Sequence, residues 1–316
     1  MSRKQKILTR LWIYQAERFP IFKHGFIIAS FSFCAICLSS LLRHNYNYPN
    51  LSISLTCFIC LFLFFLQLRI LDEFKDYEED LKYRPDRAVS RGLITLKELK
   101  ILLILCIICQ LILSAFLNWK LILIQFAIYT YMALMTVEFF AKEWLKNRIF
   151  TYMWTHMLIM PLIDFYATAC DWINANNIPP NGIIWFLIIS FFNGCILELG
   201  RKTWAKEQEI EGVNSYSSAW GLNKALYCWL SAVVTSAILG IITASYIRFT
   251  IPALITFILF LFAAINIVFG FIKNPSKKYS NVLENFSGIW VAMTYFTLGV
   301  IPMIYCNSRG FQCITF

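Results

Sequence analysis

The sequence predicts an all-helical protein that crosses a membrane many times. Of its 316 residues, 59% are hydrophobic and only 15% are charged, whereas soluble domains carry about 25% charged residues. Apolar runs of about 20 residues, the length that spans a bilayer as a helix, recur along the chain. A membrane β-barrel needs short segments of alternating polarity, and the run Phe58–Leu66 (FICLFLFFL) does not alternate. We therefore expect a polytopic bundle of helices.

Nine apolar runs are long enough to be transmembrane helices, and we expect them to surround a central cavity. They lie at 25–42, 51–71, 97–118, 120–140, 150–171, 182–200, 223–246, 250–272 and 283–305. Only Trp119–Lys120 separates the third run from the fourth, so a tight hairpin must join them. The run at 150–171 is the weakest of the nine because it contains His156, Pro161 and Asp164.

The first 24 residues form a basic, amphipathic segment without the small-residue cleavage site of a signal peptide, and we expect it at the cytoplasmic membrane surface. With this end inside, all but four of the 28 lysines and arginines lie on the cytoplasmic side; the four are Arg43, Lys120, Arg248 and Arg309. This asymmetry follows the positive-inside rule and explains the net charge of +10 without nucleic acid. We expect residues 1–316 to form one domain in the lipid bilayer of a bacterial inner membrane, with no obligatory protein partner.

The first acidic cluster follows the second span directly. Eight of the 18 carboxylates lie between Asp72 and Glu98. No helix breaker separates the span from DEFKDYEED, so we expect the helix to continue and to place Asp72, Asp76 and Asp80 on one face. Like charges at this spacing repel, so nearby basic residues or a divalent cation must offset them. Magnesium binds one or two carboxylates together with water and substrate phosphates. The alternative is a solvated mixed-charge loop, but the Asp-x3-Asp-x3-Asp spacing directly after a membrane span favours the metal.

The second acidic cluster lies four spans later, on the same predicted side. Glu198 ends the sixth span, Arg201 and Lys202 follow, and three more glutamates come next: Glu207, Glu209 and Glu211. Such a set can hold both ends of a magnesium diphosphate, because the cations bind phosphate oxygens and the acids bind the metal. Two such clusters at the inner edge of a bundle suit an amphiphile with a diphosphate head and a polyisoprenoid tail.

These residues resemble the motifs of the UbiA superfamily of intramembrane aromatic prenyltransferases, which has nine helices and two aspartate-rich cytoplasmic motifs. The first family motif reads N-D-x-x-D-x-x-x-D and is followed by R-P-x-P-x-G. Four positions match in register: Asp76, Asp80, Arg87 and Gly92. Four positions depart from the motif. This sequence has Asp72 where the family has Asn, Glu73 where it has Asp, and Ala88 and Ser90 where it has the two prolines.

The second family motif is acidic and leads into G-x-x-S/T-x-x-x-x-x-G, which is similar to the segment from Gly212 through Ser215 to Gly221. Upstream of it, glutamates stand where the family has aspartates, and the spacing needs a one-residue shift. A third family element is a Lys/Arg pair between the fourth and fifth helices, to which Lys146 and Arg148 correspond.

The resemblance implies a magnesium-dependent prenyltransferase that moves an isoprenoid group from a prenyl diphosphate to a small acceptor, such as an aromatic one. The implied catalytic residues are Asp72, Asp76, Asp80, Glu198 and Lys202. The implied Mg²⁺ ligands are Asp72, Asp76, Asp80, Glu198, Glu207, Glu209 and Glu211. The implied substrate-binding residues are Glu73, Arg87, Lys146, Arg148, Asn193 and Arg201. Basic residues would stabilise the leaving diphosphate, and rings such as Tyr131, Tyr152 or Trp154 would stabilise an allylic cation.

Two other functions remain as alternatives. A terpene cyclase of the same fold would use the same metal site without an acceptor. Transporters place charges near the membrane midplane, whereas most carboxylates of this chain lie at the cytoplasmic edge. A CDP-alcohol phosphotransferase needs Asp-Gly and Ala-Arg at fixed spacing, which this sequence lacks.

Within the fifth span, His156 and Asp164 are either groups that orient an acceptor or buried polar groups satisfied by neighbouring helices.

Overall fold

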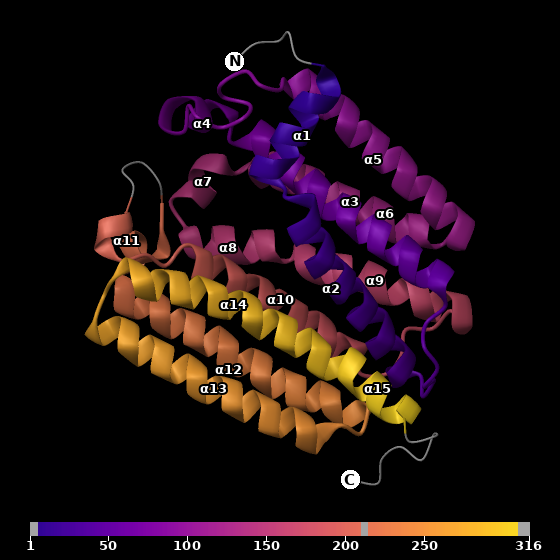
Figure 1. The fold of residues 1–316 in the computed structure, drawn as a ribbon. Helices are drawn as coiled ribbons and strands as arrows, with labels where there is room; N and C mark the ends of the chain where they lie inside the picture. Colours follow the sequence, from indigo (N-terminus) through magenta and orange to yellow (C-terminus); the bar gives the residue numbers. More distant parts are fainter. Residues whose placement is uncertain (1–5, 210–213, 309–316) are drawn as a thin grey trace. The chain divides into compact units, whose positions relative to one another are not determined.

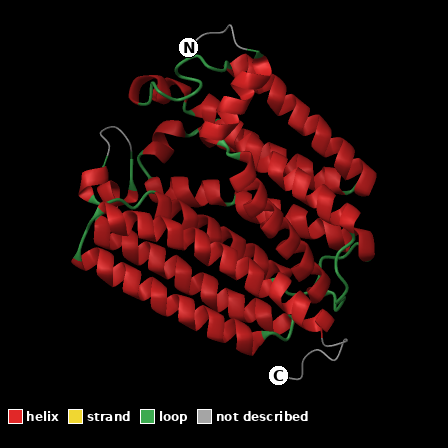
Figure 2. Cartoon of the chain, viewed as in Figure 1, coloured by secondary structure: helices red, strands yellow, loops and turns green. Residues whose placement is uncertain are grey.

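Every regular element in the described part of the chain is a helix, so the predicted all-helical fold is confirmed (Figure 2). The computed structural model describes residues 6–209 and 214–308. The chain divides into two compact units. The N-terminal unit comprises Met1–Ser32 and Asn50–Lys142, and the C-terminal unit comprises Phe33–Pro49 and Glu143–Phe316. A single domain over residues 1–316 therefore stays a prediction.

The N-terminal unit carries the first acidic cluster. Its helices, in chain order, are α1 (Ile7–Arg18), the first part of α2 (Ile21–Leu42), α3 (Leu51–Lys75), α4 (Tyr77–Tyr83), α5 (Leu96–Leu117), α6 (Leu121–Thr136) and the 3-10 helix η1 (Glu138–Phe140). The predicted amphipathic entry segment is α1, and α2 begins three residues after it. Only residues 118–120 join α5 to α6, which confirms the predicted tight hairpin.

Buried amide side chains hold α3, α5 and α6 together. Gln67 on α3 donates to Gln110 Oε1 on α5 at 2.6 Å, and Tyr129 on α6 donates to the same oxygen at 2.9 Å. Gln125 on α6 donates to Ser114 Oγ on α5 at 2.6 Å. In lipid a polar group without a partner costs several kcal/mol, and hydrogen bonds between helices also help them associate. These hydrogen bonds therefore hold α3, which leads into the first acidic cluster, against α5 and α6.

The C-terminal unit carries the second acidic cluster. After the rest of α2 it contains α7 (Lys142–Lys146), α8 (Ile149–Met157), α9 (Ile159–Ala175), α10 (Ile183–Arg201), η2 (Lys206–Gln208), α11 (Tyr216–Trp220), α12 (Leu222–Tyr246), α13 (Thr250–Lys273), α14 (Lys277–Leu298) and α15 (Val300–Ser308). Helix α10 packs against α12 and α14, and α12 packs against α13, so these long helices lie side by side (Figure 1).

Seven helices of the described residues are long and apolar enough to cross a membrane: α2, α3, α5, α10, α12, α13 and the α14–α15 segment. The predicted spans at 120–140 and 150–171 are not single long helices. Helix α6 has 16 residues and ends at Thr136, after which Glu138, Phe139 and Phe140 take positive φ angles that end regular helix. The count of nine spans therefore stays a prediction.

The predicted span at 150–171 is broken at Leu158, between α8 and α9. Pro161 explains the position of the break, because a proline has no N–H to bond the carbonyl four residues earlier. It lies in the first turn of α9, where the backbone N–H groups of a helix have no partner within the helix. The sequence signal that made this span the weakest thus corresponds to a real interruption.

Candidate functional site

The first acidic cluster lies where α3 gives way to α4. Asp76 separates the two helices, with φ −95° and ψ 7°. Helical backbone hydrogen bonds persist on both sides: Asp76 N donates to Asp72 O at 2.9 Å and Asp80 N donates to Asp76 O at 2.8 Å. The expected single continuous helix through DEFKDYEED is therefore wrong, because the helix is interrupted at Asp76. Repulsion between carboxylates spaced four residues apart favours this interruption.

Basic side chains neutralise the two ends of the row but not its centre. Asp72 pairs with Arg69 and Lys75, each at 3.7 Å, and Asp80 pairs with Arg84 at 3.6 Å and closely with Arg87. Within residues 6–209 and 214–308, no side chain forms an ion pair or hydrogen bond with the Asp76 carboxylate.

The half-buried carboxyl group of Asp76 is electrostatically unsatisfied. Burial raises its pKa, Lys75 lowers it, and the carboxylates of Asp72, Asp80 and Glu79 raise it further. An anion in this position is stabilised by any cation that binds to it. Basic residues therefore form ion pairs with Asp72 and Asp80 at the two ends of the row. The carboxylate of Asp76 at its centre remains available to bind a metal cation.

The donor set at Asp76 fits a hydrated magnesium ion. No three His, Cys, Asp or Glu side chains of the described residues cluster closely enough to hold a metal by themselves. Magnesium does not need such a cage, since it keeps several waters and uses one or two carboxylates together with substrate phosphates. The hard oxygens of Asp76, with Asp72 one turn earlier, supply the carboxylates that this mode requires.

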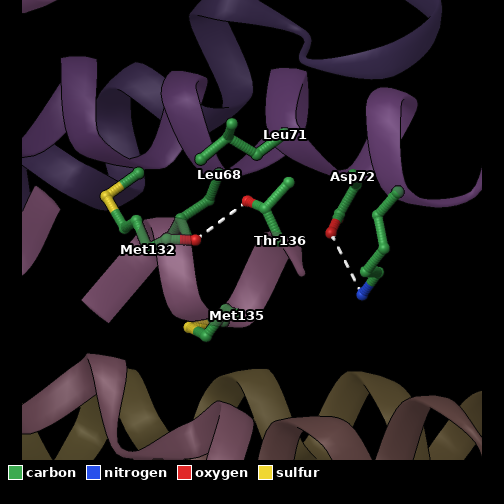
Figure 3. Close-up of a pocket in the computed structure, with 7 residues that line it drawn as sticks. Leu68, Leu71, Asp72, Met132, Met135 and Thr136 are labelled. Carbon is green, nitrogen blue, oxygen red and sulfur yellow. Dashed lines mark hydrogen bonds and ion pairs between the residues drawn. The ribbon is translucent and has the colours of Figure 1, made fainter. Parts of the chain in front are cut away.

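A small pocket adjoins Asp72 between α3 and α6 (Figure 3). Its volume is about 10 Å³, which is room for a single water molecule. The lining is mostly apolar and consists of Leu68, Leu71, Asp72, Lys75, Met132, Met135 and Thr136. Thr136 directs its hydroxyl away to the carbonyl of Met132, at 2.8 Å. The pocket is too small for a diphosphate. Its apolar lining shows where the acidic row meets the hydrophobic interior between α3 and α6.

Two predicted substrate-binding residues of this cluster are engaged in ion pairs. Glu73 is buried and accepts a hydrogen bond from Arg18 Nε of α1 at 2.5 Å. Arg87 is held by Asp80. Their roles toward a substrate stay predictions. The contact of Glu73 with α1 was missed by sequence reasoning, although the mixed charges of α1 were a visible signal for it.

The second acidic cluster is organised around Glu198, which is buried near the end of α10. Its carboxylate accepts hydrogen bonds from Arg201 Nη2 at 2.5 Å and Lys202 Nζ at 2.9 Å. The side chain of Arg201 is nevertheless 54% exposed and that of Lys202 is 29% exposed. The pairing therefore holds two cations at a fixed place while leaving them accessible to an anionic ligand.

Close packing fixes the turn of α10 that carries Glu198. A side chain at Gly200 would place its Cβ 2.1 Å from Ser287 Oγ of α14, so only glycine permits this approach. Tyr216, a buried residue missed by sequence reasoning, lies near Glu198 and Arg201. Burial raises the pKa of its hydroxyl, Glu198 raises it too and Arg201 lowers it. Its position directly after Ser215 of the motif was the only signal in the sequence.

The later glutamates of this cluster make structural contacts. Glu207 Oε1 accepts a hydrogen bond from the backbone N of Lys277, the first residue of α14, at 2.6 Å. Glu209 accepts from the hydroxyls of Ser215 and Ser217, each at 2.7 Å. Glu211 lies outside the described residues. A metal-binding role for these three glutamates stays a prediction.

A surface hollow of about 500 Å³ lies beside this loop. Its lining residues are Trp204, Glu207, Gln208 and Lys277. Its lining contains one cation, the exposed Lys277, beside the carboxylate of Glu207. A single cation next to a carboxylate gives little net positive charge to attract a diphosphate.

The remaining predicted substrate-binding residues differ in exposure. Lys146 and Arg148 are exposed near α7, and the Arg148 guanidinium lies 4.5 Å from the centre of the Trp144 ring. Asn193 is buried on α10, five residues before Glu198. Its Oδ1 accepts from Ser236 Oγ at 3.0 Å, and its Nδ2 has no hydrogen-bond partner among the described residues. Asn193 thus joins α10 to α12 and keeps one donor available.

The two ionisable groups of the predicted fifth span make separate contacts. His156 Nδ1 lies 2.8 Å from the carbonyl oxygen of Tyr152, and its ring stacks on the Tyr152 ring with centroids 4.0 Å apart. Asp164 accepts a hydrogen bond from the hydroxyl of Tyr295 on α14. For Asp164 this favours the interpretation as a buried polar group satisfied by a neighbouring helix.

The fold is that of a polytopic, all-helical membrane protein. Residues 30–298 match the UbiA prenyltransferase family, and the chain belongs to this family. The resemblance noted from the two acidic motifs is thereby confirmed. No curated protein sequence matches the chain significantly.

Two solved structures are similar to this chain. A structure of a digeranylgeranylglyceryl phosphate synthase matches with a TM-score of 0.65 and 18% identity, over 94% of this chain and 99% of that one. The apo structure of a UbiA homologue from Aeropyrum pernix K1 matches with a TM-score of 0.64 and 14% identity, over 85% and 96% of the two chains. At these identities the likeness shows the fold alone.

Proposed function

We propose that this protein is a magnesium-dependent prenyltransferase that moves an isoprenoid group from a prenyl diphosphate to a small acceptor. The observation that carries the proposal is the carboxylate of Asp76. It makes no ion pair among the described residues and is attracted only by the field of the adjacent Lys75, whereas Asp72 and Asp80 each form ion pairs. Membership of the UbiA prenyltransferase family supports the reaction class.

In this proposal Asp76 and Asp72 hold the magnesium ion, which when bound neutralises diphosphate charge. In the C-terminal unit, the accessible cations Arg201 and Lys202, anchored by Glu198, would bind phosphate oxygens and stabilise the charge of a leaving diphosphate. The allylic C–O bond breaks with its electron pair passing to the diphosphate oxygen. The acceptor then forms a bond to the allylic carbon and loses a proton to solvent.

We also propose that both acidic loops face the cytoplasm. The charge asymmetry of the loops supports this orientation. Single cysteines placed at exposed Glu78 and at exposed Asn177, which lies in the loop between α9 and α10, should differ in labelling by an impermeant maleimide in sealed right-side-out vesicles. The cysteine at 177 should be labelled and that at 78 should not; the reverse pattern would overturn the orientation.

The reaction is tested with purified protein in lipid nanodiscs and farnesyl diphosphate as the probe. Diphosphate release should require Mg²⁺ and should be lost in Asp76→Ala. The matched control is Glu78→Ala, which removes an exposed carboxylate from the same acidic segment and should retain release. Equal release from both variants would refute the site. A hydrocarbon product formed without any acceptor would instead identify a terpene cyclase.

A further inference from the structure

We propose that α1 is a positioning element that holds the first acidic cluster in shape through two ion pairs, Arg18–Glu73 and Glu17–Arg91. The inference rests on the proposed function, because the ligand served is the metal and diphosphate at Asp76. The two pairs come from adjacent residues of α1 and reach opposite ends of the cluster.

The first pair fixes the cluster where α3 ends. Arg18 Nε donates to Glu73 Oε1 at 2.5 Å, and the side chains are 13% and 2% exposed. Glu73 precedes Asp76 by three residues and lies in the last turn of α3. Removing one partner of a buried pair leaves an uncompensated charge that the surrounding structure must rearrange to solvate. The last turn of α3 is therefore tied to α1.

The second pair fixes the segment that follows α4. Arg91 donates to both carboxylate oxygens of Glu17, at 2.6 and 3.0 Å, and this bidentate geometry sets orientation as well as distance. Arg91 also donates to the carbonyl oxygen of Asp86 at 2.5 Å. The same segment carries Arg87, which holds Asp80. Glu17 thus stabilises the segment whose Arg87 pairs with Asp80. In the same way, Arg18 stabilises the last turn of α3, which leads into Asp76.

A buried hydrophobic cluster holds α1 against the elements that carry the partners of these two ion pairs. Tyr14, one turn before Arg18, is 1% exposed and packs in a buried cluster with Ile70, Ala88, Val89, Leu93, Ile94 and Leu99. The cluster joins α1, the end of α3, the segment after α4 and the start of α5, all within the N-terminal unit. Burial of Tyr14 therefore sets the register at which both ion pairs meet their partners.

A third ion pair of α1 provides the matched control. Arg10 donates to both oxygens of Glu98, at 2.6 and 3.2 Å, and to the carbonyl oxygen of Leu93 at 3.3 Å. This pair anchors α1 to the start of α5, away from the three aspartates. Losing it should leave Tyr14 buried and should keep the Arg18–Glu73 and Glu17–Arg91 pairs in place.

The experiment compares full-length Arg18→Gln, Glu17→Gln and the control Arg10→Gln in nanodiscs. The first readout is hydrogen exchange of residues 72–92, which needs no activity. The second is the Mg²⁺ concentration for half-maximal diphosphate release from farnesyl diphosphate. We expect the first two variants to exchange faster and to need about tenfold more Mg²⁺, with kcat near wild type once Mg²⁺ is saturating. Arg10→Gln should leave both readouts unchanged.

Two further variants separate positioning from folding. Arg18→Lys keeps the charge and should restore most of the Mg²⁺ response. The double variant Arg18→Gln with Glu73→Gln leaves no buried charge unpaired, so it should fold normally and still show the raised Mg²⁺ requirement. Wild-type exchange and Mg²⁺ response in that variant, or equal effects from Arg10→Gln, would overturn the inference. Absence of release from the wild type would refute the proposed function, and the exchange data would still decide the role of α1.

Discussion

Replacing Asp76 by asparagine should stabilise the metal-free protein while abolishing its reaction. The substitution removes a half-buried anion that has like-charged neighbours four residues away on both sides, Asp72 and Asp80. Each such pair costs a few tenths of a kcal/mol, so we expect Asp76→Asn to raise the free energy of unfolding by about 1 kcal/mol at neutral pH. A functional carboxylate that weakens the fold is a recognised trade-off between activity and stability.

The pH dependence of this gain has a definite sign. Because the pKa of Asp76 is raised in the folded state, the folded protein binds a proton more tightly than the unfolded chain does. The contribution of Asp76 to wild-type stability therefore becomes more favourable as pH falls through that raised pKa, and the advantage of Asp76→Asn should shrink. The assay is SDS-induced unfolding in mixed micelles between pH 8 and pH 4, with and without Mg²⁺. A destabilised variant, or one that Mg²⁺ still stabilises, would refute the reasoning.

Three more outcomes follow from the structure. Glu198→Gln frees Lys202 from its anchor, so the KM for farnesyl diphosphate should rise about tenfold; an unchanged KM would contradict the anchoring role. Asp171→Asn removes the buried carboxylate that accepts two hydrogen bonds from the partly buried Arg43 and should cost about 3 kcal/mol of unfolding free energy, with wild-type stability as the contrary result. Protonation of Asp76 should compete with Mg²⁺, so the half-saturating Mg²⁺ concentration should increase from pH 8 to pH 5; a flat profile would count against Asp76 as a ligand.

Features set by local pattern were predictable from the sequence. Apolar length and composition predicted the long helices, and Trp119–Lys120 predicted the tight hairpin. The mixed charges of residues 1–24 predicted an amphipathic segment, which the structure shows to contain α1 and the start of α2. Pro161 signalled a weak span, and the break at Leu158 lies three residues before it. Each of these depends on neighbours within a few residues, which is why periodicity and helix breakers were sufficient to find them.

Features set by tertiary contact were not predictable. Glu73 pairs with Arg18 across 55 positions, and Glu207 reaches the start of α14 across 70 positions. Spacing along the chain identified both as acidic members of a motif but carried no information about their partners. The interruption at Asp76 was missed for a different reason: the segment contains no proline or glycine, and the repulsion between carboxylates four residues apart was not expected to end the helix.

The proposed function depends above all on magnesium binding at Asp76. An experimental structure of the protein in lipid, with Mn²⁺ and a non-reactive thiolo-diphosphate analogue, would locate the metal. We expect anomalous manganese signal beside the Asp76 carboxylate. Manganese bound elsewhere, with none at Asp76, would refute the proposed site.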